Sequence, residues 1–316
     1  MPICEADPWR LQYFAGVACP DDVRISTEDA DSWEWYPAHR WIYDKLAVAL
    51  SQGLEAAPHG VKPPFFPVFS KPIMNLRGMG TGSRAIASAA DYAAALTPGH
   101  FWCRLLTGRH VSSDVALVDG EPRWWRHATG AAGDGGMFDH WHVHADGMDE
   151  VEAWCGTWAR RHLAGYTGMA NFETIGGRII EAHLRFADQW PDLYGAGWVE
   201  ALVRLYASGE WRFADADRAD GFSVVLFAPH GRRYRHPPTA VVEKVRGMAG
   251  VSSVQITFHE DRDPGGHAMP PGGFRVAIVN AATLAAGVAG REILARVMVG
   301  EGRASASVGT DGGHGP

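Results

Sequence analysis

The segment at residues 171–185, NFETIGGRIIEAHLR, constrains the fold of this chain more than any other. Strand-forming residues flank the glycine pair at 176–177, and this pattern predicts a β-hairpin. With a plain two-residue turn, Glu173 would face Ile180, and the two glutamates would lie on opposite faces of the hairpin. A three-residue loop or a β-bulge would instead place Glu173 opposite Glu181.

The second register separates a polar face of the hairpin from an apolar one. The polar face carries Asn171, Glu173, Glu181, His183 and Arg185, and the apolar face carries Phe172, Ile180, Ala182 and Leu184. We favour this register because pairing is fixed where one face is buried. Opposed carboxylates repel by about 0.2–1 kcal/mol in an exposed sheet, so we expect a cation between them. Mg²⁺ suits such oxygen ligands. The alternative is a surface hairpin whose charges face water.

Composition excludes several classes of protein. The chain has 316 residues, of which 46% are hydrophobic, enough for a substantial core arranged as two lobes of one unit. A net charge of −7 without a basic run argues against nucleic acid as a partner. No secretion signal or long apolar run is present, so we expect a cytoplasmic protein that does not enter membranes. Four cysteines without CxxC spacing are expected to be reduced.

Local patterns predict an alternation of helices and strands. We expect residues 1–43 to form an irregular arm or a reduced leading domain, followed by a helix within residues 36–54. A later helix is expected to begin near Ser83 as its N-cap. Strands and helices alternate over residues 221–296, and the polar, Gly-rich segment 301–316 is expected to be disordered.

A glycine-rich loop follows a strand that carries Lys71. Gly78, Gly80 and Gly82 in this loop allow backbone N–H groups to approach phosphate oxygens closely, and Lys71 can reach the same phosphates as a mobile charge. The loop matches neither the Walker A nor the dinucleotide-binding pattern. The alternative is a flexible surface loop.

These segments together resemble the ATP-grasp superfamily, on its carboxylase and carboxylate–amine ligase side. The Asp44–Lys45 pair is similar to the pair that opens the ATP-binding region of those enzymes. FPVFSKPIMNLRGMGTGSR is similar to their lysine strand and glycine loop, and RHVSSDVALVDG is similar to a strand of biotin carboxylases. Their metal hairpin ends in Glu-x-Asn-x-Arg, which reads EAHLR here. The four matches occur in the family's order over residues 44–212.

The resemblance implies an α+β ATP-grasp fold, with two α+β lobes clamping ATP and a shortened N-terminal domain. It places the ATP-grasp domain at residues 44–300, with a small lobe at about 60–102 and a large lobe at about 103–300. The implied ATP-binding residues are Lys45, Lys71, Gly78, Gly80, Gly82, Ser83 and His110. The implied Mg²⁺ ligands are Glu173, Glu181 and His183, and Arg185 is implied to stabilise a developing anion. His183 replaces the family's usual Asn, and Trp102 stands near the position of an acidic residue that contacts the base.

The activity implied by the resemblance is ATP- and Mg²⁺-dependent ligation. A small-molecule or peptide carboxylate would be joined to an amine through an acyl phosphate, with release of ADP and phosphate. A homodimer is left open. One alternative is a nucleotide-binding protein that has lost catalysis and acts as a partner subunit. Another is a hydrolase with a metal on the strand that carries His140, His142 and His144, because the three side chains share one face.

Overall fold

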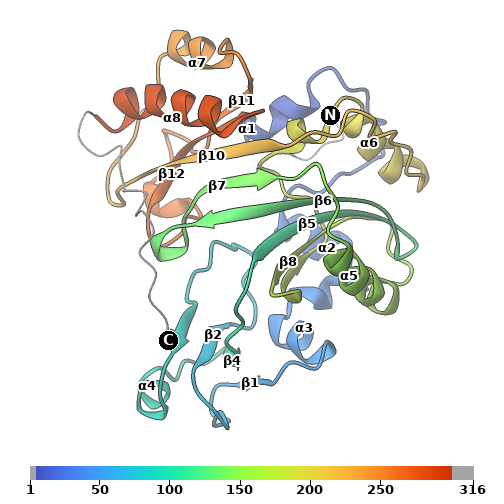
Figure 1. Ribbon diagram of the computed structural model, residues 1–316, viewed down its shortest axis with the longest axis vertical. Coiled ribbons are helices and arrows are strands. Elements are labelled where there is room, and N and C mark those ends of the chain that lie inside the picture. Colours follow the sequence, from blue (N-terminus) through green and yellow to red (C-terminus); the bar gives the residue numbers. More distant parts are fainter. Residues whose placement is uncertain (1–4, 301–316) are drawn as a thin grey trace.

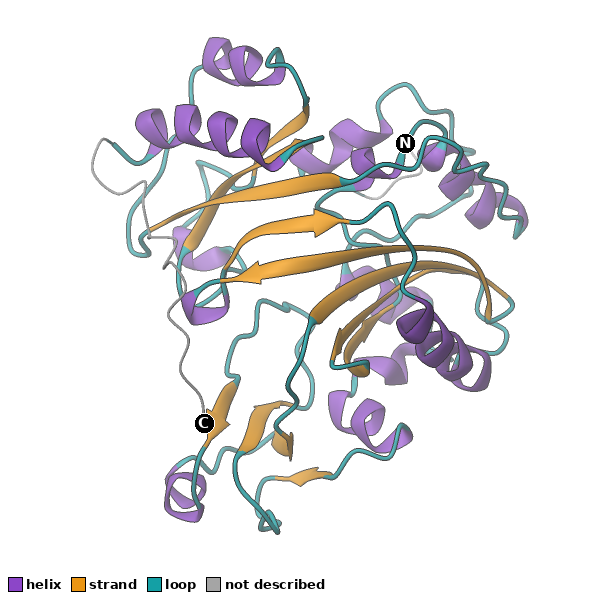
Figure 2. Ribbon diagram, in the orientation of Figure 1, coloured by secondary structure: helices purple, strands orange, loops and turns teal. Residues whose placement is uncertain are grey.

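The computed structural model describes residues 5–300, which form two antiparallel β-sheets of unequal size with helices packed around them (Figure 1). The smaller sheet has the strand order β1-β4-β2-β3, and the larger has the order β11-β12-β10-β7-β6-β5-β8-β9. Figure 2 shows the small sheet below the long, curved large sheet. The predicted α+β architecture is therefore confirmed. The disorder predicted for residues 301–316 lies outside the described residues.

The small sheet holds the glycine-rich loop. Its elements are β1 (Ala56–Pro58), β2 (Val68–Pro72), β3 (Arg84–Ile86), β4 (His100–Arg104) and helix α4 (Ala89–Ala94). The prediction that a helix begins at Ser83 is wrong. Residues 84–86 pair with β2, and Ser88 caps α4 by accepting a hydrogen bond from the Asp91 N–H. Burial of Ile86 in the core of this sheet outweighs the helix propensity of the surrounding alanines. The loop therefore joins two strands of a hairpin.

The large sheet is covered by helices on both faces. Its strands are β5 (His110–Val118), β6 (Glu121–Ala132), β7 (Phe138–Val143), β8 (Gly168–Ile175), β9 (Arg178–His183), β10 (Gly221–Ala228), β11 (Val251–Ile256) and β12 (Phe274–Ala281). Its helices are α5 (Asp149–His162), α6 (Trp198–Ser208), α7 (Thr239–Arg246) and α8 (Leu284–Met298). Phe172 packs on the face covered by α5, whereas Met169 packs on the face covered by α6. The period of two along β8 therefore places Glu173 on the α6 face.

The hairpin of β8 and β9 has the register that was predicted. Glu173 is paired with Glu181, and the ladder shifts between Glu173 and Thr174, which is paired with Ile179. The turn is the two-residue glycine pair, and both glycines have positive φ, 56° and 75°. A tight turn and a β-bulge at Ile180 therefore occur together, and the bulge returns the glutamates to one face.

The N-terminal residues contact both edges of the large sheet. Helix α1 (Pro8–Leu11) lies beside β11, and Tyr13 Oη lies 3.1 Å from Ser253 Oγ on that strand. Helix α2 (Asp29–Trp35) lies near β9, where Ser32 Oγ donates a hydrogen bond to the Leu184 carbonyl at 3.0 Å. We call residues 5–35 the N-terminal arm. Within residues 5–300, no helix has both the length and the apolar character needed to cross a lipid bilayer.

Candidate active site

A basic side chain reaches each of the two opposed glutamates. Lys45 Nζ lies 2.6 Å from Glu181 Oε1, and His110 Nε2 lies 3.1 Å from Glu173 Oε2. Burial raises the pKa of Glu173, but the hydrogen bond and charge of His110 outweigh it and lower this pKa to about 2. Glu173 is therefore ionised at neutral pH. An ionised carboxylate is the form that ligates a metal ion.

Lys45 owes its position to a helix cap. It is the first residue of α3 (Lys45–Ser51), and the Asp44 carboxylate accepts a hydrogen bond from the Ala47 N–H at 2.8 Å. The helix predicted within residues 36–54 is present as α3, but it is shorter than the segment that the pattern indicated. Residues 40–43 form a separate 3₁₀ turn, and the extended backbone of Asp44 separates this turn from α3.

Lys71 reaches the same hairpin from the small sheet. It lies on β2, and its Nζ donates a hydrogen bond to the Ile180 carbonyl at 2.6 Å. Ile180 is the bulged residue, so its carbonyl is free of the β8 ladder. Burial is the main cause that lowers the pKa of Lys71, and the nearby Lys45 lowers it further. Two lysines that are distant in sequence thus converge on β9.

The glycine-rich loop adopts a backbone that favours glycine. Gly78, Met79 and Gly80 have φ values of 62°, 60° and 62°. Asn75 Nδ2 donates a hydrogen bond to the Gly78 carbonyl at 2.8 Å and so braces the loop. A Cβ added at Gly136 would lie 3.8 Å from the Met79 carbonyl oxygen. The tip of the loop therefore borders the β6–β7 turn of the large sheet.

Asp29 in the N-terminal arm belongs to the same cluster, although the sequence analysis did not select it. Its carboxylate receives two hydrogen bonds from Arg185, Nε to Oδ1 at 2.8 Å and Nη2 to Oδ2 at 3.0 Å. His183 Nδ1 lies 3.0 Å from both oxygens, and the Tyr43 hydroxyl donates to Oδ1 at 3.2 Å. Burial raises the pKa of Asp29, but Arg185 and His183 hold it well below its usual range.

The contacts of Asp29 determine how His183 and Arg185 face the site. His183 Nε2 lies 3.8 Å from Glu181 Oε1, so this is the ring nitrogen that faces the glutamate pair. Arg185 is held by Asp29 and by the Phe186 carbonyl, to which Nη1 donates at 3.1 Å. The Arg185 guanidinium is thus hydrogen-bonded to groups of the protein itself. No local sequence pattern signalled this, because Asp29 and Arg185 are 156 residues apart.

A buried hydrogen-bond network supports the hairpin next to the glutamates. Asp114 accepts hydrogen bonds from Asn171 Nδ2 at 2.6 Å, the Tyr194 hydroxyl at 2.6 Å and the Ala187 N–H at 2.9 Å. Burial raises the pKa of Asp114 to about 6. Through Asp114, the side chains of Asn171 and Tyr194 therefore tie β8 and the turn at 191–194 to β5.

Trp102 is buried in the small-sheet core, where its Nε1 donates a hydrogen bond to the Val61 carbonyl at 2.7 Å.

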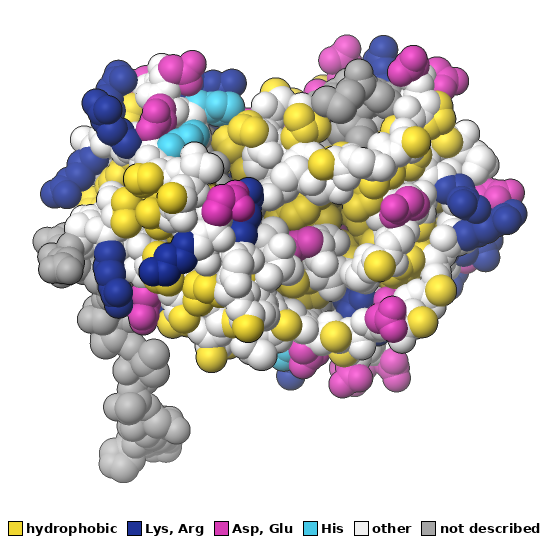
Figure 3. Space-filling view, turned by 90° about the horizontal axis from the view of Figure 1, so that it is seen from above, with side chains coloured by type: hydrophobic (Ala, Val, Ile, Leu, Met, Phe, Trp, Pro, Cys, Tyr) yellow, Lys and Arg dark blue, Asp and Glu magenta, His cyan; other side chains and the backbone are white. Residues whose placement is uncertain are grey.

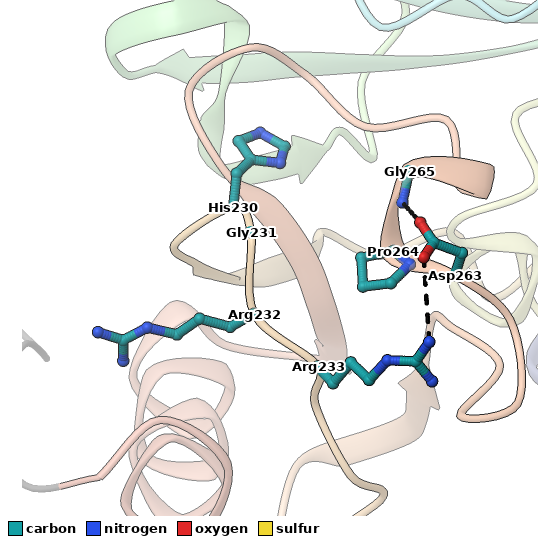
Figure 4. Close-up of a pocket in the computed structure, with 7 residues that line it drawn as sticks. All are labelled: His230, Gly231, Arg232, Arg233, Asp263, Pro264 and Gly265. Carbon is teal, nitrogen blue, oxygen red and sulfur yellow. Dashed lines mark hydrogen bonds and ion pairs between the residues drawn. The ribbon is translucent and has the colours of Figure 1, made fainter.

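A surface pocket of about 390 Å³ lies elsewhere, between the loop after β10 and residues 263–265 (Figure 4). Arg233 Nη2 lies 3.9 Å from Asp263 Oδ2, and both side chains are largely exposed. Arg232 points away from that pair in Figure 4. None of the predicted site residues lines this pocket. On the face shown in Figure 3, basic and acidic side chains are interspersed.

Comparisons with known proteins identify the fold. No protein-family model matches the chain, and no curated protein matches it in sequence. Among solved structures, an L-amino acid ligase from Bacillus licheniformis matches with a TM-score of 0.61 and 12% identity, over 92% of this chain and 82% of that one. The N5-carboxyaminoimidazole ribonucleotide synthetase from Thermus thermophilus matches with a TM-score of 0.58 and 17% identity, over 93% and 85%. The phosphoribosylglycinamide synthetase from Anaerococcus prevotii matches with a TM-score of 0.52 and 10% identity, over 82% and 75%. The chain therefore has the ATP-grasp fold, as its sequence motifs predicted.

Proposed function

We propose that this protein is an ATP- and Mg²⁺-dependent ligase that joins a carboxylate to an amine. The observation that carries the proposal is the convergence of Lys45 and Lys71 on the hairpin where Glu173 and Glu181 oppose each other. Anion-binding lysines beside a carboxylate pair suit a metal-bound polyphosphate. The names of the enzymes that share the fold support this choice of reaction class.

The donor set fits Mg²⁺. Two carboxylates on adjacent strands offer hard oxygen ligands, and Glu173 is ionised at neutral pH. Bound there, Mg²⁺ would neutralise charge on the transferred phosphoryl group. Glu173 and Glu181 would hold the ion, with His183 Nε2 as the further candidate ligand on the same side. The short ion pair between Lys45 and Glu181 supports a cation-binding role for this point of the hairpin.

The remaining residues would bind and orient ATP. Lys45 and Lys71 would hold the phosphates, the loop from Gly78 to Ser83 would cover them with backbone N–H groups, and His110 would line the nucleotide. A carboxylate oxygen of the substrate would attack the γ-phosphorus with ADP as the leaving group. The amine would then attack the acyl carbon and release phosphate. Arg185 would stabilise the oxyanion formed in that second step.

Glu181→Gln tests this proposal. The change keeps the shape of the side chain but removes one negative charge from the metal-binding set. With ATP, Mg²⁺ and paired carboxylates and amines, we expect ADP formation to fall on the order of 10²-fold or more. The melting temperature should change little, because relief of repulsion with Glu173 offsets the weakened Lys45 contact.

Glu121→Gln is the matched control, since Glu121 forms an exposed pair with Arg160 at 2.9 Å. It should leave ADP formation unchanged. Equal turnover in Glu181→Gln and the parent protein would contradict the metal-site assignment. Release of AMP and pyrophosphate would contradict the acyl-phosphate reaction.

A second candidate function is a nucleotide-binding partner subunit without ligase activity. It is favoured by one observation: the Arg185 fork and His183 Nδ1 are both engaged by Asp29. Calorimetry with ATP and Mg²⁺ separates the two functions. Binding of ATP without ADP formation, across all carboxylate and amine pairs, would support the partner subunit.

A further inference from the structure

Two histidines and one aspartate gather on the face of the large sheet opposite to the glutamate pair. His142 lies on β7 and His144 follows it on the same face, whereas the intervening Val143 points into the α6-side core. Asp220 directly precedes β10, whose first residue is the register partner of Val143. The three side chains therefore meet where β7 and β10 are joined.

The cluster has the dimensions of a metal site. One ligand atom from each residue lies within 4.8 Å of the other two. His142 Nε2 and Asp220 Oδ2 are 3.1 Å apart, and the two imidazole ring centroids are 4.0 Å apart. His142 Nε2 is buried, and its contact with Asp220 Oδ2 lacks the geometry of a hydrogen bond. A buried polar atom without a hydrogen bond is costly, and a bound ion would satisfy it.

Neighbouring groups hold the three side chains in place. Thr129 Oγ1 lies 2.8 Å from His144 Nε2, and the Ala145 N–H donates to Asp220 Oδ1 at 2.7 Å. The His142 ring is stacked on Phe222, with centroids 4.5 Å apart. Such outer contacts orient imidazole and carboxylate ligands around a metal ion.

His140 does not belong to the cluster. It lies on the same face, but its Nδ1 is 2.9 Å from Asp139 Oδ2. The group of potential ligand atoms thus contains Asp220 and not His140, which the sequence analysis had considered together with His142 and His144. The pairing of β7 with β10 brings Asp220 to the site, and this long-range contact could not be predicted from spacing along one strand.

We propose that His142, His144 and Asp220 bind a divalent transition-metal ion of the zinc type. Two imidazoles and one carboxylate make a ligand set that Zn²⁺ accepts, with water completing a tetrahedral shell. The ion would link β7 to β10, the strand at which the β10–β12 portion of the sheet begins. This role is structural and does not depend on the proposed ligase reaction, since the sheet separates the two sites.

Metal binding to tag-free protein, previously stripped with a chelator, tests the proposal. We expect one equivalent of Co²⁺ to give the visible absorption of a tetrahedral complex, and Zn²⁺ to displace it. Excess Mg²⁺ should not. At free Zn²⁺ a hundredfold above Kd, the unfolding equilibrium constant should fall about a hundredfold, with a rise of a few degrees in melting temperature.

Three single variants locate the site. His142→Ala and His144→Ala should each weaken Co²⁺ binding by at least about a hundredfold, whereas His140→Ala should bind like the parent protein. Circular dichroism of the metal-free variants checks that they are folded. If a variant is unfolded, Asp220→Asn, at an exposed position, replaces it in the comparison. No cobalt complex in the parent, or undiminished binding by folded His142 and His144 variants, would overturn the proposal.

Discussion

At the scale of single residues, Asp29 explains how three cationic or polar side chains can be buried together. Its carboxylate contacts Arg185, His183 and Tyr43, which come from two separate parts of the chain. Buried charges persist only when they are paired and hydrogen-bonded. Asp29 is thus the counter-ion that allows Arg185 and His183 to lie beside the glutamate hairpin.

Asp29→Asn should destabilise the protein by about 3 kcal/mol near pH 5–6, because it leaves the largely buried Arg185 without its anion. The pH dependence follows from two shifted groups. The pKa of Asp29 is lowered from 3.8, so its contribution is present above pH 4 and is lost as pH falls further. The pKa of His183 is raised from 6.5, with burial opposing and Asp29 favouring the charged form. Its contribution is present below pH 6.5 and is lost as pH rises.

The difference in unfolding free energy between the parent and Asp29→Asn should therefore be largest between about pH 4 and 6.5. Urea denaturation at a series of pH values measures it. Asp31→Asn, on the same helix but partly exposed, is the control and should change stability little. A difference that does not vary with pH would contradict the Asp29–His183 pair.

The pairing of Glu173 with Glu181 could be predicted because a period of two, a glycine turn and a buried face leave few registers. A phosphate-binding role for Lys71 could be suggested from its place beside the glycine-rich loop, whereas one for Lys45 could be suggested only through resemblance. Asp29 could not be predicted at all, since an acidic residue in an irregular segment has no local pattern and its partners are set by tertiary packing.

At the scale of elements, the two glycines of the β8–β9 hairpin, Gly176 and Gly177, differ in their surroundings. A Cβ added at Gly176 would lie 2.4 Å from the Thr107 carbonyl oxygen, whereas one added at Gly177 would have nothing within 4 Å. Gly176 N–H also donates to the Arg109 carbonyl at 3.2 Å. The hairpin tip is therefore docked on the connection between β4 and β5, which joins the two sheets.

Gly176→Ala should displace this connection, and Gly177→Ala should not. Both changes strain a positive φ, at a cost of about 1 kcal/mol each. Gly176→Ala adds the clash with Thr107, so we expect a clearly lower melting temperature and weaker ATP binding by calorimetry. Equal effects of the two substitutions would show that the tip is not docked in solution.

The helix predicted to begin near Ser83 shows why local sequence patterns did not place every element correctly. Ser83 and the alanines after it have the composition of a helix start, but pairing of residues 84–86 with β2 determined the outcome. Edge pairing of three residues depends on a strand elsewhere in the chain. Local propensity does not contain that information.

At the scale of the whole molecule, the N-terminal arm contacts both the α6 side and the β11 edge of the large sheet. Phe14 and Ile25 are buried in the same core as α6 residues, while Gln12 Nε2 donates to the Val254 carbonyl of β11 at 3.3 Å. The order of motifs was enough to predict the ATP-grasp fold. The docking of the arm was not predicted, because its apolar residues have no regular period.

Phe14→Ala should destabilise the entire protein by about 3–5 kcal/mol, since it opens a cavity in this core. We expect tryptophan fluorescence and far-UV circular dichroism to report one coincident transition, shifted to lower temperature. Val61→Ala is the control, because Val61 is 51% exposed. A variant in which one signal shifts and the other does not would contradict the arm as a link between α6 and β11.

The two outer strands of the large sheet are β11 and β9, and on β9 side chains form hydrogen bonds with backbone groups that face away from the sheet. On β9, Gln52 Oε1 accepts a hydrogen bond from the Ile179 N–H at 3.0 Å, and Gln52 Nε2 donates one to the Ile179 carbonyl at 2.5 Å. Lys71 Nζ donates a hydrogen bond to the Ile180 carbonyl. An open strand edge is a template for pairing with another molecule and so for aggregation. Here that template is blocked by the protein's own residues. Self-association by strand addition at β9 is disfavoured, and any homodimer would have to form through another surface.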